Sequence, residues 1–128
     1  MKTILAIDDD PIVLKILTKF LTPDYDMVMC RSAADATARL SQKVPALILL
    51  DIEMPDISGF EFLHTIKKNP RLMNVPVLVV SGHFEDEFIA HAKKSGASDL
   101  VPKPINKEDL FQKIEQAFAH PVKNIFGL

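Results

Sequence analysis

Residues 46–51 read Ala-Leu-Ile-Leu-Leu-Asp, five apolar residues in a row that stop at one carboxylate. A run this short, apolar at every position instead of at alternate ones, is typical of a strand covered on both faces of a sheet. Three further apolar runs also lead to a polar residue: 4–7 to Asp8-Asp9-Asp10, 75–80 to Ser81, and 100–101 through Pro102 to Lys103. If these runs are parallel strands, their carboxyl ends lie along one edge of one sheet, where α/β folds bind ligands.

At that edge, side chains from distant parts of the chain would meet. The set comprises three carboxylates, one hydroxyl and one ammonium, from Asp8, Asp9, Asp51, Ser81 and Lys103. It suits one magnesium ion, which prefers oxygen ligands, and one phosphoryl group, which a carboxylate can accept as an acyl phosphate. Two carboxylate charges about 4 Å apart repel each other by on the order of 4 kcal/mol at an effective dielectric constant near 20. We therefore expect the metal-free pocket to favour uptake of a proton or a metal ion.

Short apolar runs alternate with helical patterns along the whole chain. Strands are expected near 3–8, 25–30, 46–51, 75–80 and 98–102. Helix signals stand between them, namely Asp10-Pro11, Ser32, Gly59 with Asn69-Pro70 as a stop, Gly96 ending a helix at about 84–95, and Asn106. The buried stripe expected for the first helix is Ile12, Val13, Ile16, Leu17, Phe20 and Leu21, and for the third Phe60, Leu63 and Ile66. Five alternations predict an α/β fold, a mostly parallel sheet with helices on both faces.

The composition limits the classes of function. The chain has 128 residues, 48% hydrophobic and 25% charged, which predicts one globular domain at 1–120, with 121–128 as a C-terminal extension or the start of a linker. A net charge of −2 without a basic patch argues against direct nucleic-acid binding. The longest apolar stretch is too short for a bilayer, and the start does not read as a secretory signal. The single cysteine, Cys30, fits a reducing compartment, so we expect a cytoplasmic protein without a membrane partner.

The polar strand ends match one known pattern, in order and over nearly the whole chain. The matching segments are Asp8-Asp9-Asp10-Pro11, Leu49-Leu50-Asp51-Ile52-Glu53-Met54-Pro55 with Gly59, Ser81-Gly82, and Gly96-Ala97-Ser98-Asp99 before Lys103-Pro104. On these residues the chain resembles the response-regulator receiver domains of two-component systems, the chemotaxis regulators in particular. The resemblance implies a flavodoxin-like, three-layer α/β/α fold, with a five-stranded parallel sheet in the order 2-1-3-4-5 and five helices.

The resemblance also implies a role for each polar residue. Asp51 would be the phosphoacceptor, and the Mg²⁺ ligands would be Asp8, Asp9, Asp51 and the backbone carbonyl of Glu53. Ser81 would donate a hydrogen bond to a phosphoryl oxygen. Lys103 would pair with Asp51 before phosphorylation and with the phosphoryl group afterwards. The Lys103-Pro104 bond is a candidate cis peptide, as in relatives.

The implied partners follow from this chemistry. A histidine kinase or phosphotransfer protein would donate the phosphoryl group from a phosphohistidine, and a downstream effector protein or domain would receive the signal. A phosphorylation-dependent dimer is a further option. Such a domain phosphorylates only itself and later hydrolyses its own acyl phosphate, so we do not expect an enzyme with turnover.

The chain departs from the family pattern at one position. Relatives commonly carry Tyr or Phe three residues before the lysine, where this chain has Leu100, so we do not carry over the usual aromatic readout of phosphorylation. Glu53 and His83, each two residues past a pocket residue, occupy positions that border the entrance to the phosphoryl group in relatives. Either side chain can orient or block attacking water. The remaining histidines are expected on the surface: His64, His91 and His120.

Two other functions fit part of the pattern. A receiver fold kept as a constitutive docking module would bind its partner equally well with and without a phosphoryl mimic such as beryllofluoride. A phosphatase of the haloacid-dehalogenase type also uses aspartate, magnesium, a hydroxyl and lysine on a parallel sheet. Those enzymes place the nucleophile after the first strand, with a second aspartate two residues on, whereas here Glu53 follows a third-strand Asp51. Steady turnover of a small phosphate ester would favour that reading.

Overall fold

Strands and helices alternate along the chain in the order that the sequence predicts. The computed structural model describes residues 1–54, 56–83 and 85–120, so the expected C-terminal extension at 121–128 lies outside the described residues. The elements are β1 (Thr3–Ile7), α1 (Pro11–Leu21), β2 (Asp26–Cys30), α2 (Ala33–Gln42), β3 (Leu47–Asp51), α3 (Gly59–Lys68), β4 (Val77–Ser81), α4 (Asp86–Lys94), β5 (Asp99–Pro102) and α5 (Lys107–Ala119). The five strands form one parallel sheet in the order β2-β1-β3-β4-β5. The expected strand order is confirmed.

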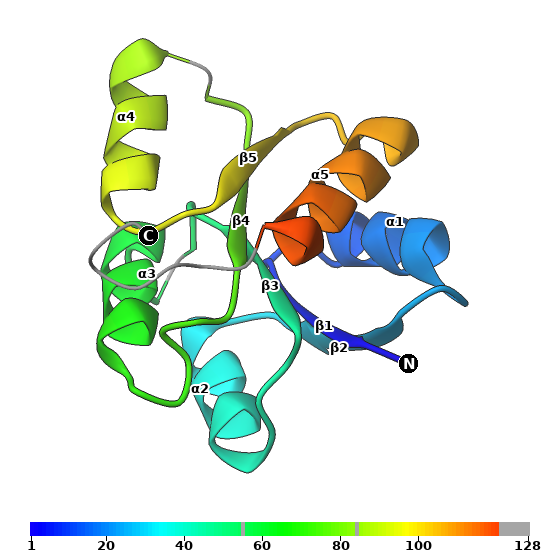
Figure 1. Cartoon of the computed structure of the whole chain (residues 1–128), viewed down its shortest axis with the longest axis horizontal. Coiled ribbons are helices and arrows are strands. Elements are labelled where there is room, and N and C mark those ends of the chain that lie inside the picture. Colours follow the sequence, from blue (N-terminus) through cyan, green and yellow to red (C-terminus); the bar gives the residue numbers. More distant parts are fainter. Residues whose placement is uncertain (55, 84, 121–128) are drawn as a thin grey trace.

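The sheet is the middle of three layers. Alternate residues of each strand face opposite sides: Ile4 and Ala6 of β1 join the core under α1 and α5, while Leu5 and Ile7 join the core under α2, α3 and α4. Figure 1 shows this division, with α1 and α5 on one side of the sheet and the other three helices on the opposite side. Because both faces are covered, β1, β3 and β4 are buried at every position. The α/β/α, flavodoxin-like architecture is therefore confirmed.

The buried stripe of α1 differs from the expected one. Leu14, Leu17 and Leu21 face the core, whereas Ile12 is 66% exposed and Ile16 is 37% exposed. The helix is apolar on most of its surface, so the positions of apolar residues did not distinguish the inner face from the outer one. In α3, likewise, Phe62 is buried, and Phe60, expected in the core, is only partly covered.

Local signals set the helix starts and turns as expected. The side chains of Asp10, Ser32 and Asn106 accept hydrogen bonds from the second or third amide of α1, α2 and α5, at 2.9, 3.1 and 2.9 Å. After α4, Gly96 has a φ of 109°, which a residue with a side chain rarely adopts. The Lys103-Pro104 peptide is cis as expected, and Thr22-Pro23 is cis as well. Among the described residues, no helix is long and apolar enough to cross a membrane.

Gly59 closes the loop that follows the central strand β3. Its amide donates to the carbonyl oxygen of Ile52 at 3.0 Å, and a β-carbon at this position would lie 2.4 Å from the Ile52 Cα. The backbone of Ile52 continues directly from β3 and cannot move away cheaply. Gly82 offers a comparison, because a β-carbon there would meet nothing within 4 Å.

We expect Gly59→Ala to lower the free energy of unfolding by about 2–3 kcal/mol, the range of a forced overlap in a packed region. Gly82→Ala is the matched control and should change it by less than about 0.5 kcal/mol. Urea unfolding followed by far-UV circular dichroism measures both. Equal unfolding midpoints for the two variants would contradict the close approach of Gly59 to Ile52.

Candidate functional site

The sheet brings the predicted polar residues to one edge. Asp51 and Ser81 are the last residues of β3 and β4, and Lys103 follows β5 directly. The strand register aligns these ends, since Asp51 pairs with Val80, and Ser81 pairs with Pro102. Asp8 and Asp9 follow β1, whose last residue is paired with Leu50. Neighbouring parallel strands that end at the same level carry these side chains to a common place.

Three carboxylates lie together at the centre of this edge. One oxygen each from Asp8, Asp9 and Asp51 can be chosen so that all lie within 4.8 Å of one another. Asp8 is 2% and Asp51 is 5% exposed, while Asp9 lies at the surface. The cluster is therefore open on one side and shielded from water on the other, as a site with exchangeable ligands requires.

Lys103 is the positive charge of the cluster. Its Nζ lies 3.4 Å from Asp8 Oδ2 and 3.6 Å from Asp51 Oδ1, so one ammonium is shared between two buried carboxylates. Desolvation alone would lower the pKa of Lys103, but the charges of Asp51 and Asp8 outweigh it and raise that pKa above its ordinary value. Lys103 therefore stays charged throughout the physiological pH range.

The surroundings of Asp51 disfavour its ionisation. Its pKa is raised from 3.8 to about 6, first because burial penalises the charged form and then because Asp8 is negative. The amide of Glu53, which donates to Asp51 Oδ1 at 3.1 Å, and the ammonium of Lys103 pull the pKa the other way without cancelling the rise. One lysine does not neutralise the cluster.

The cluster fits a divalent cation such as Mg²⁺. Asp8 Oδ1 accepts from the amide of Asp10 at 2.9 Å, but its buried Oδ2 accepts no hydrogen bond from the described residues and has only the ion-pair contact with Lys103. A buried oxygen without a hydrogen bond is costly, and a hard cation would satisfy it. The carbonyl of Glu53 lies in the β3–α3 loop, two residues after Asp51, and its role as a metal ligand stays a prediction.

Ser81 lies at the neighbouring strand end. It is 5% exposed, and its Oγ accepts a hydrogen bond from the amide of His83 at 3.0 Å, so its hydroxyl hydrogen remains available. The backbone amide of Lys103 donates to the Ser81 carbonyl oxygen at 2.9 Å. The hydroxyl at the end of β4 and the ammonium just after β5 therefore belong to residues joined directly by a backbone hydrogen bond.

Glu53 and His83 connect the two loops above the cluster. His83 Nε2 and Glu53 Oε1 are 2.5 Å apart, and His83 Nδ1 is 3.7 Å from a carboxylate oxygen of Glu85. Both side chains of the closer pair are about half or more exposed, at 49% and 68%. The sequence singled out these two residues separately, and their contact joins the β3–α3 loop to the β4–α4 loop.

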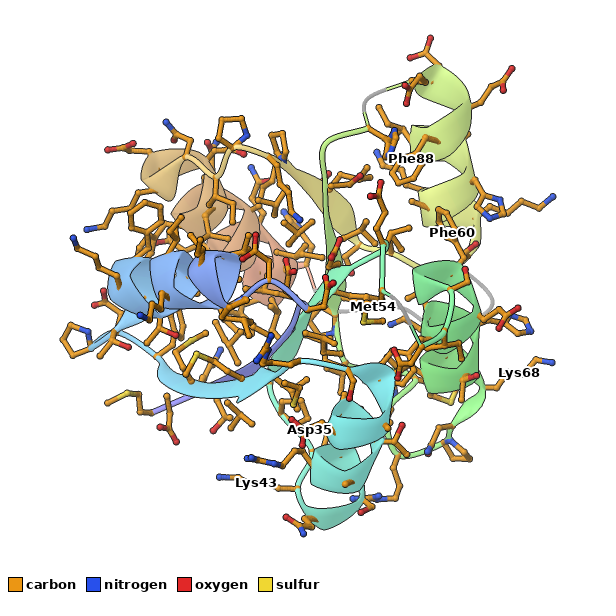
Figure 2. The ribbon with its side chains drawn as sticks, turned by 180° about the vertical axis from the view of Figure 1, so that it is seen from behind. Asp35, Lys43, Met54, Phe60, Lys68 and Phe88 are labelled. Atoms are coloured by element: carbon orange, nitrogen blue, oxygen red, sulfur yellow. The ribbon has the colours of Figure 1, made fainter. Side chains whose placement is uncertain are left out.

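An aromatic cluster lies next to this connection. The ring of His83 contacts Phe88 in a tilted arrangement, with ring centres 5.3 Å apart, and Phe88 meets Phe60 edge-on at 5.5 Å. Figure 2 shows Phe88 beside α4 and Phe60 where the ends of α3 and α4 come close. His91 is exposed as expected, but its ring also contacts Phe60, at 4.2 Å between centres. The sequence pattern did not indicate this cluster, because its members come from two helices and a loop.

Leu100 stands at the position where the family resemblance implies an aromatic ring, and a pocket lies beside it. It is partly buried and packs against the core under α2, α3 and α4. A pocket of about 240 Å³ lies beside it, with Ser81, Ile89 and Lys113 among the lining residues. The buried strand end at Ser81 is thus reachable from the side of α4, β5 and α5.

The contact that one residue beside the site makes was not predicted from the sequence. The carboxylate of Asp56, in the β3–α3 loop, accepts from the amides of Ala33 and Ala34 at 3.4 and 3.2 Å. These amides begin α2, far away in the sequence. An aspartate within a loop reads as a turn residue, and nothing in its spacing indicates which helix it caps.

The raised pKa of Asp51 predicts an unusual dependence of stability on pH. Between the ordinary value of 3.8 and about 6, the folded protein binds the Asp51 proton more tightly than the unfolded chain does. Its contribution to folding is therefore neutral below the ordinary pKa and unfavourable above the raised one, by on the order of 2–3 kcal/mol. In metal-free buffer, Asp51→Asn should raise the free energy of unfolding at pH 8 and lose that gain towards pH 4.5. Urea titrations at several pH values measure it.

The exposed Asp24 supplies the control for this prediction, since Asp24→Asn makes the same chemical change after the end of α1. It should give no gain at pH 8. A gain for Asp51→Asn that is equal at pH 4.5 and pH 8 would contradict a raised pKa at Asp51.

Known proteins share both this sequence pattern and this fold. A family model described as the response regulator receiver domain matches residues 4–115. PilH of Pseudomonas aeruginosa is 28% identical over 120 residues, which are 93% of this chain and 99% of PilH. A CheY-like response regulator receiver domain protein from Methanospirillum hungatei has a solved structure with a TM-score of 0.84 and 28% identity, covering 93% of this chain and 94% of that one.

Some relatives are much longer than this chain. A protein-glutamate methylesterase/protein-glutamine glutaminase of Rhodopseudomonas palustris is 39% identical over 106 residues, which are 79% of this chain but 28% of that protein. The likeness thus concerns one part of that protein. Since the family match covers most of the residues and the fold agrees, this chain belongs to the response-regulator receiver domains of two-component signalling.

Proposed function

We propose that the chain accepts a phosphoryl group on Asp51, with Mg²⁺ bound beside it, and that this switches its contacts with other proteins. The observation that carries the proposal is the cluster itself: a buried Asp51, two further carboxylates within 4.8 Å, and an ammonium 3.6 Å away. A purely structural role explains this cluster poorly, because like charges gathered in a shielded place oppose folding. The same set suits a site built for a cation and a phosphoryl group.

The donor in this proposal is a phosphohistidine on a partner histidine kinase or phosphotransfer protein in the cytoplasm. An oxygen of the ionised Asp51 attacks phosphorus in line with the phosphorus–nitrogen bond. A phosphorus–oxygen bond forms, the phosphorus–nitrogen bond breaks, and its electron pair stays on the imidazole of the partner. Since the pKa of Asp51 is about 6, most of this carboxylate is in the attacking form at neutral pH.

The other residues stabilise charge and hold position. Asp8, Asp9, Asp51 and the carbonyl of Glu53 would hold Mg²⁺, which when bound offsets negative charge on the phosphoryl oxygens. Lys103, already between Asp8 and Asp51, would move its ammonium to a phosphoryl oxygen. The Ser81 hydroxyl would donate to another oxygen and draw the β4–α4 loop with it. Later hydrolysis of the acyl phosphate resets the domain, so it is a switch and not an enzyme with turnover.

The downstream partner is proposed to be an effector protein or domain that distinguishes the two states, and a phosphorylation-dependent dimer would serve the same purpose. The second candidate function is a docking module whose binding does not depend on phosphorylation. The pocket beside Leu100 is the observation that supports it. A haloacid-dehalogenase-type phosphatase has none, because the phosphoacceptor candidate ends β3 instead of β1. The intact acidic cluster favours the switch.

Incubation with acetyl phosphate and Mg²⁺ should add one phosphoryl group per chain, detected by intact-mass spectrometry. Asp51→Asn should abolish the adduct, because an amide cannot attack phosphorus to form an acyl phosphate. Asp24→Asn, the matched change at an exposed aspartate, should leave it intact. An adduct that survives Asp51→Asn, or none on the unaltered chain, would overturn the proposed function.

The contact between His83 and Glu53 should slow hydrolysis of the acyl phosphate by covering the approach of water. His83→Ala removes the ring that contacts Phe88 and hydrogen-bonds to Glu53, so the lifetime of the phosphoryl group should fall by roughly threefold or more. His64→Ala, at an exposed position of α3, should leave the lifetime unchanged. Decay of the phosphorylated mass with time measures both. An unchanged or longer lifetime for His83→Ala would rule out a shielding role.

A further inference from the structure

Asp56 joins the loop after the phosphoacceptor strand to a helix on the same face of the sheet. Its Oδ1 accepts from the Ala33 amide at 3.4 Å and its Oδ2 from the Ala34 amide at 3.2 Å. These are the first two amides of α2, which lack a partner within the helix. The third, at Asp35, donates to the Ser32 hydroxyl at 3.1 Å. Asp56 and Ser32 thus divide the capping of α2 between a distant residue and a local one.

The N-terminus of α2 and the Asp56 carboxylate also attract each other. A helix N-terminus carries a partial positive charge, which attracts a carboxylate held against its first amides. Replacing either capping side chain by alanine removes hydrogen bonds from α2. Only the replacement of Asp56 also frees the β3–α3 loop from that helix.

The described residues of the β3–α3 loop, 52–54 and 56–58, are held at several points. Its base is closed by the hydrogen bond from the Gly59 amide to the Ile52 carbonyl, at 3.0 Å. Met54 and Ile57 pack against the core under α2, α3 and α4, and Asp56, between them, reaches α2. The same short loop carries Glu53, whose amide bonds Asp51. When a segment is fixed on both sides of a metal-binding residue, that residue is already in position and does not rearrange when the metal binds.

We propose that Asp56 is a positioning residue for the metal site: by tying the β3–α3 loop to the N-terminus of α2, it fixes the segment that presents the Glu53 carbonyl. The inference rests on the proposed function, since it assigns Mg²⁺ to the cluster of Asp8, Asp9 and Asp51. Asp56 itself touches neither the cation nor the phosphoryl group.

Thermodynamic linkage makes this coupling work in both directions. If the contact between Asp56 and α2 strengthens Mg²⁺ binding, then bound Mg²⁺ strengthens that contact by the same factor. The amides of Ala33 and Ala34 should therefore exchange with solvent deuterium more slowly when Mg²⁺ is present. This readout does not involve phosphorylation, and it reports on the contact itself.

The experiment compares three variants of the full chain with the unaltered protein. Asp56→Ala removes the distant cap and the tie to the loop, and Ser32→Ala is the matched control that removes the local cap alone. Asp56→Asn keeps one oxygen able to accept an amide hydrogen. Isothermal titration calorimetry gives the Mg²⁺ dissociation constant, and hydrogen exchange by NMR follows the amides of Ala33 and Ala34.

Asp56→Ala should weaken Mg²⁺ binding about three- to tenfold and abolish the Mg²⁺-dependent protection of both amides. Ser32→Ala should change the dissociation constant less than about twofold, although both variants lower the unfolding midpoint. Asp56→Asn should restore part of the affinity. That pattern separates positioning of the loop from simple stabilisation of α2.

Two results would overturn the proposal, and they differ in meaning. Equal Mg²⁺ affinities for Asp56→Ala and Ser32→Ala, or amide protection that does not respond to Mg²⁺ in the unaltered chain, would overturn the role of Asp56 alone. Failure of the unaltered chain to bind Mg²⁺ at all would overturn this inference together with the proposed metal site.

Discussion

Electrostatic repulsion between the buried carboxylates of Asp8 and Asp51 is the constraint on which the rest of the site depends. Both side chains are almost fully shielded, and Lys103, placed between them, is a single charge. The remaining negative charge raises the free energy of the metal-free state. Binding of a cation or a proton lowers that free energy again. Folding supplies the energy to hold this arrangement, because both faces of the central strands are packed under helices.

The sheet topology explains why such distant residues can share one place. β1 and β3 are neighbours at the centre of the sheet, and β4 and β5 continue in order on one side. The two carboxylate-bearing strand ends therefore stand side by side, with the hydroxyl and the ammonium next in line. Around this row, the contacts of Glu53 with His83 and of Asp56 with α2 tie the neighbouring loops to other elements. The loops that border the site are thus held from two directions.

Sequence reasoning reached the strand ends and missed the contacts between loops. Asp51, Ser81 and Lys103 could be placed because a continuous apolar run fixes where a parallel strand ends, and strand ends share an edge. The inner face of α1 could not be placed, because apolar residues such as Ile12 occupy its outer side too. The partners of Asp56 and His83 depend on how two loops approach each other, which short-range pattern does not encode.

The backbone hydrogen bond from the Lys103 amide to the Ser81 carbonyl has a consequence for how this strand edge can move. A shift of the Ser81 peptide group displaces the backbone nitrogen of Lys103 that is hydrogen-bonded to it. The positions of the Ser81 hydroxyl and the Lys103 ammonium are therefore coupled through the backbone. A change in the backbone of β4 or β5 that moves one of these two groups would therefore displace the other as well. The loops that follow these two residues do not share this hydrogen bond. Substitutions in those loops are therefore the easier way for such a domain to change how long a phosphoryl group would persist.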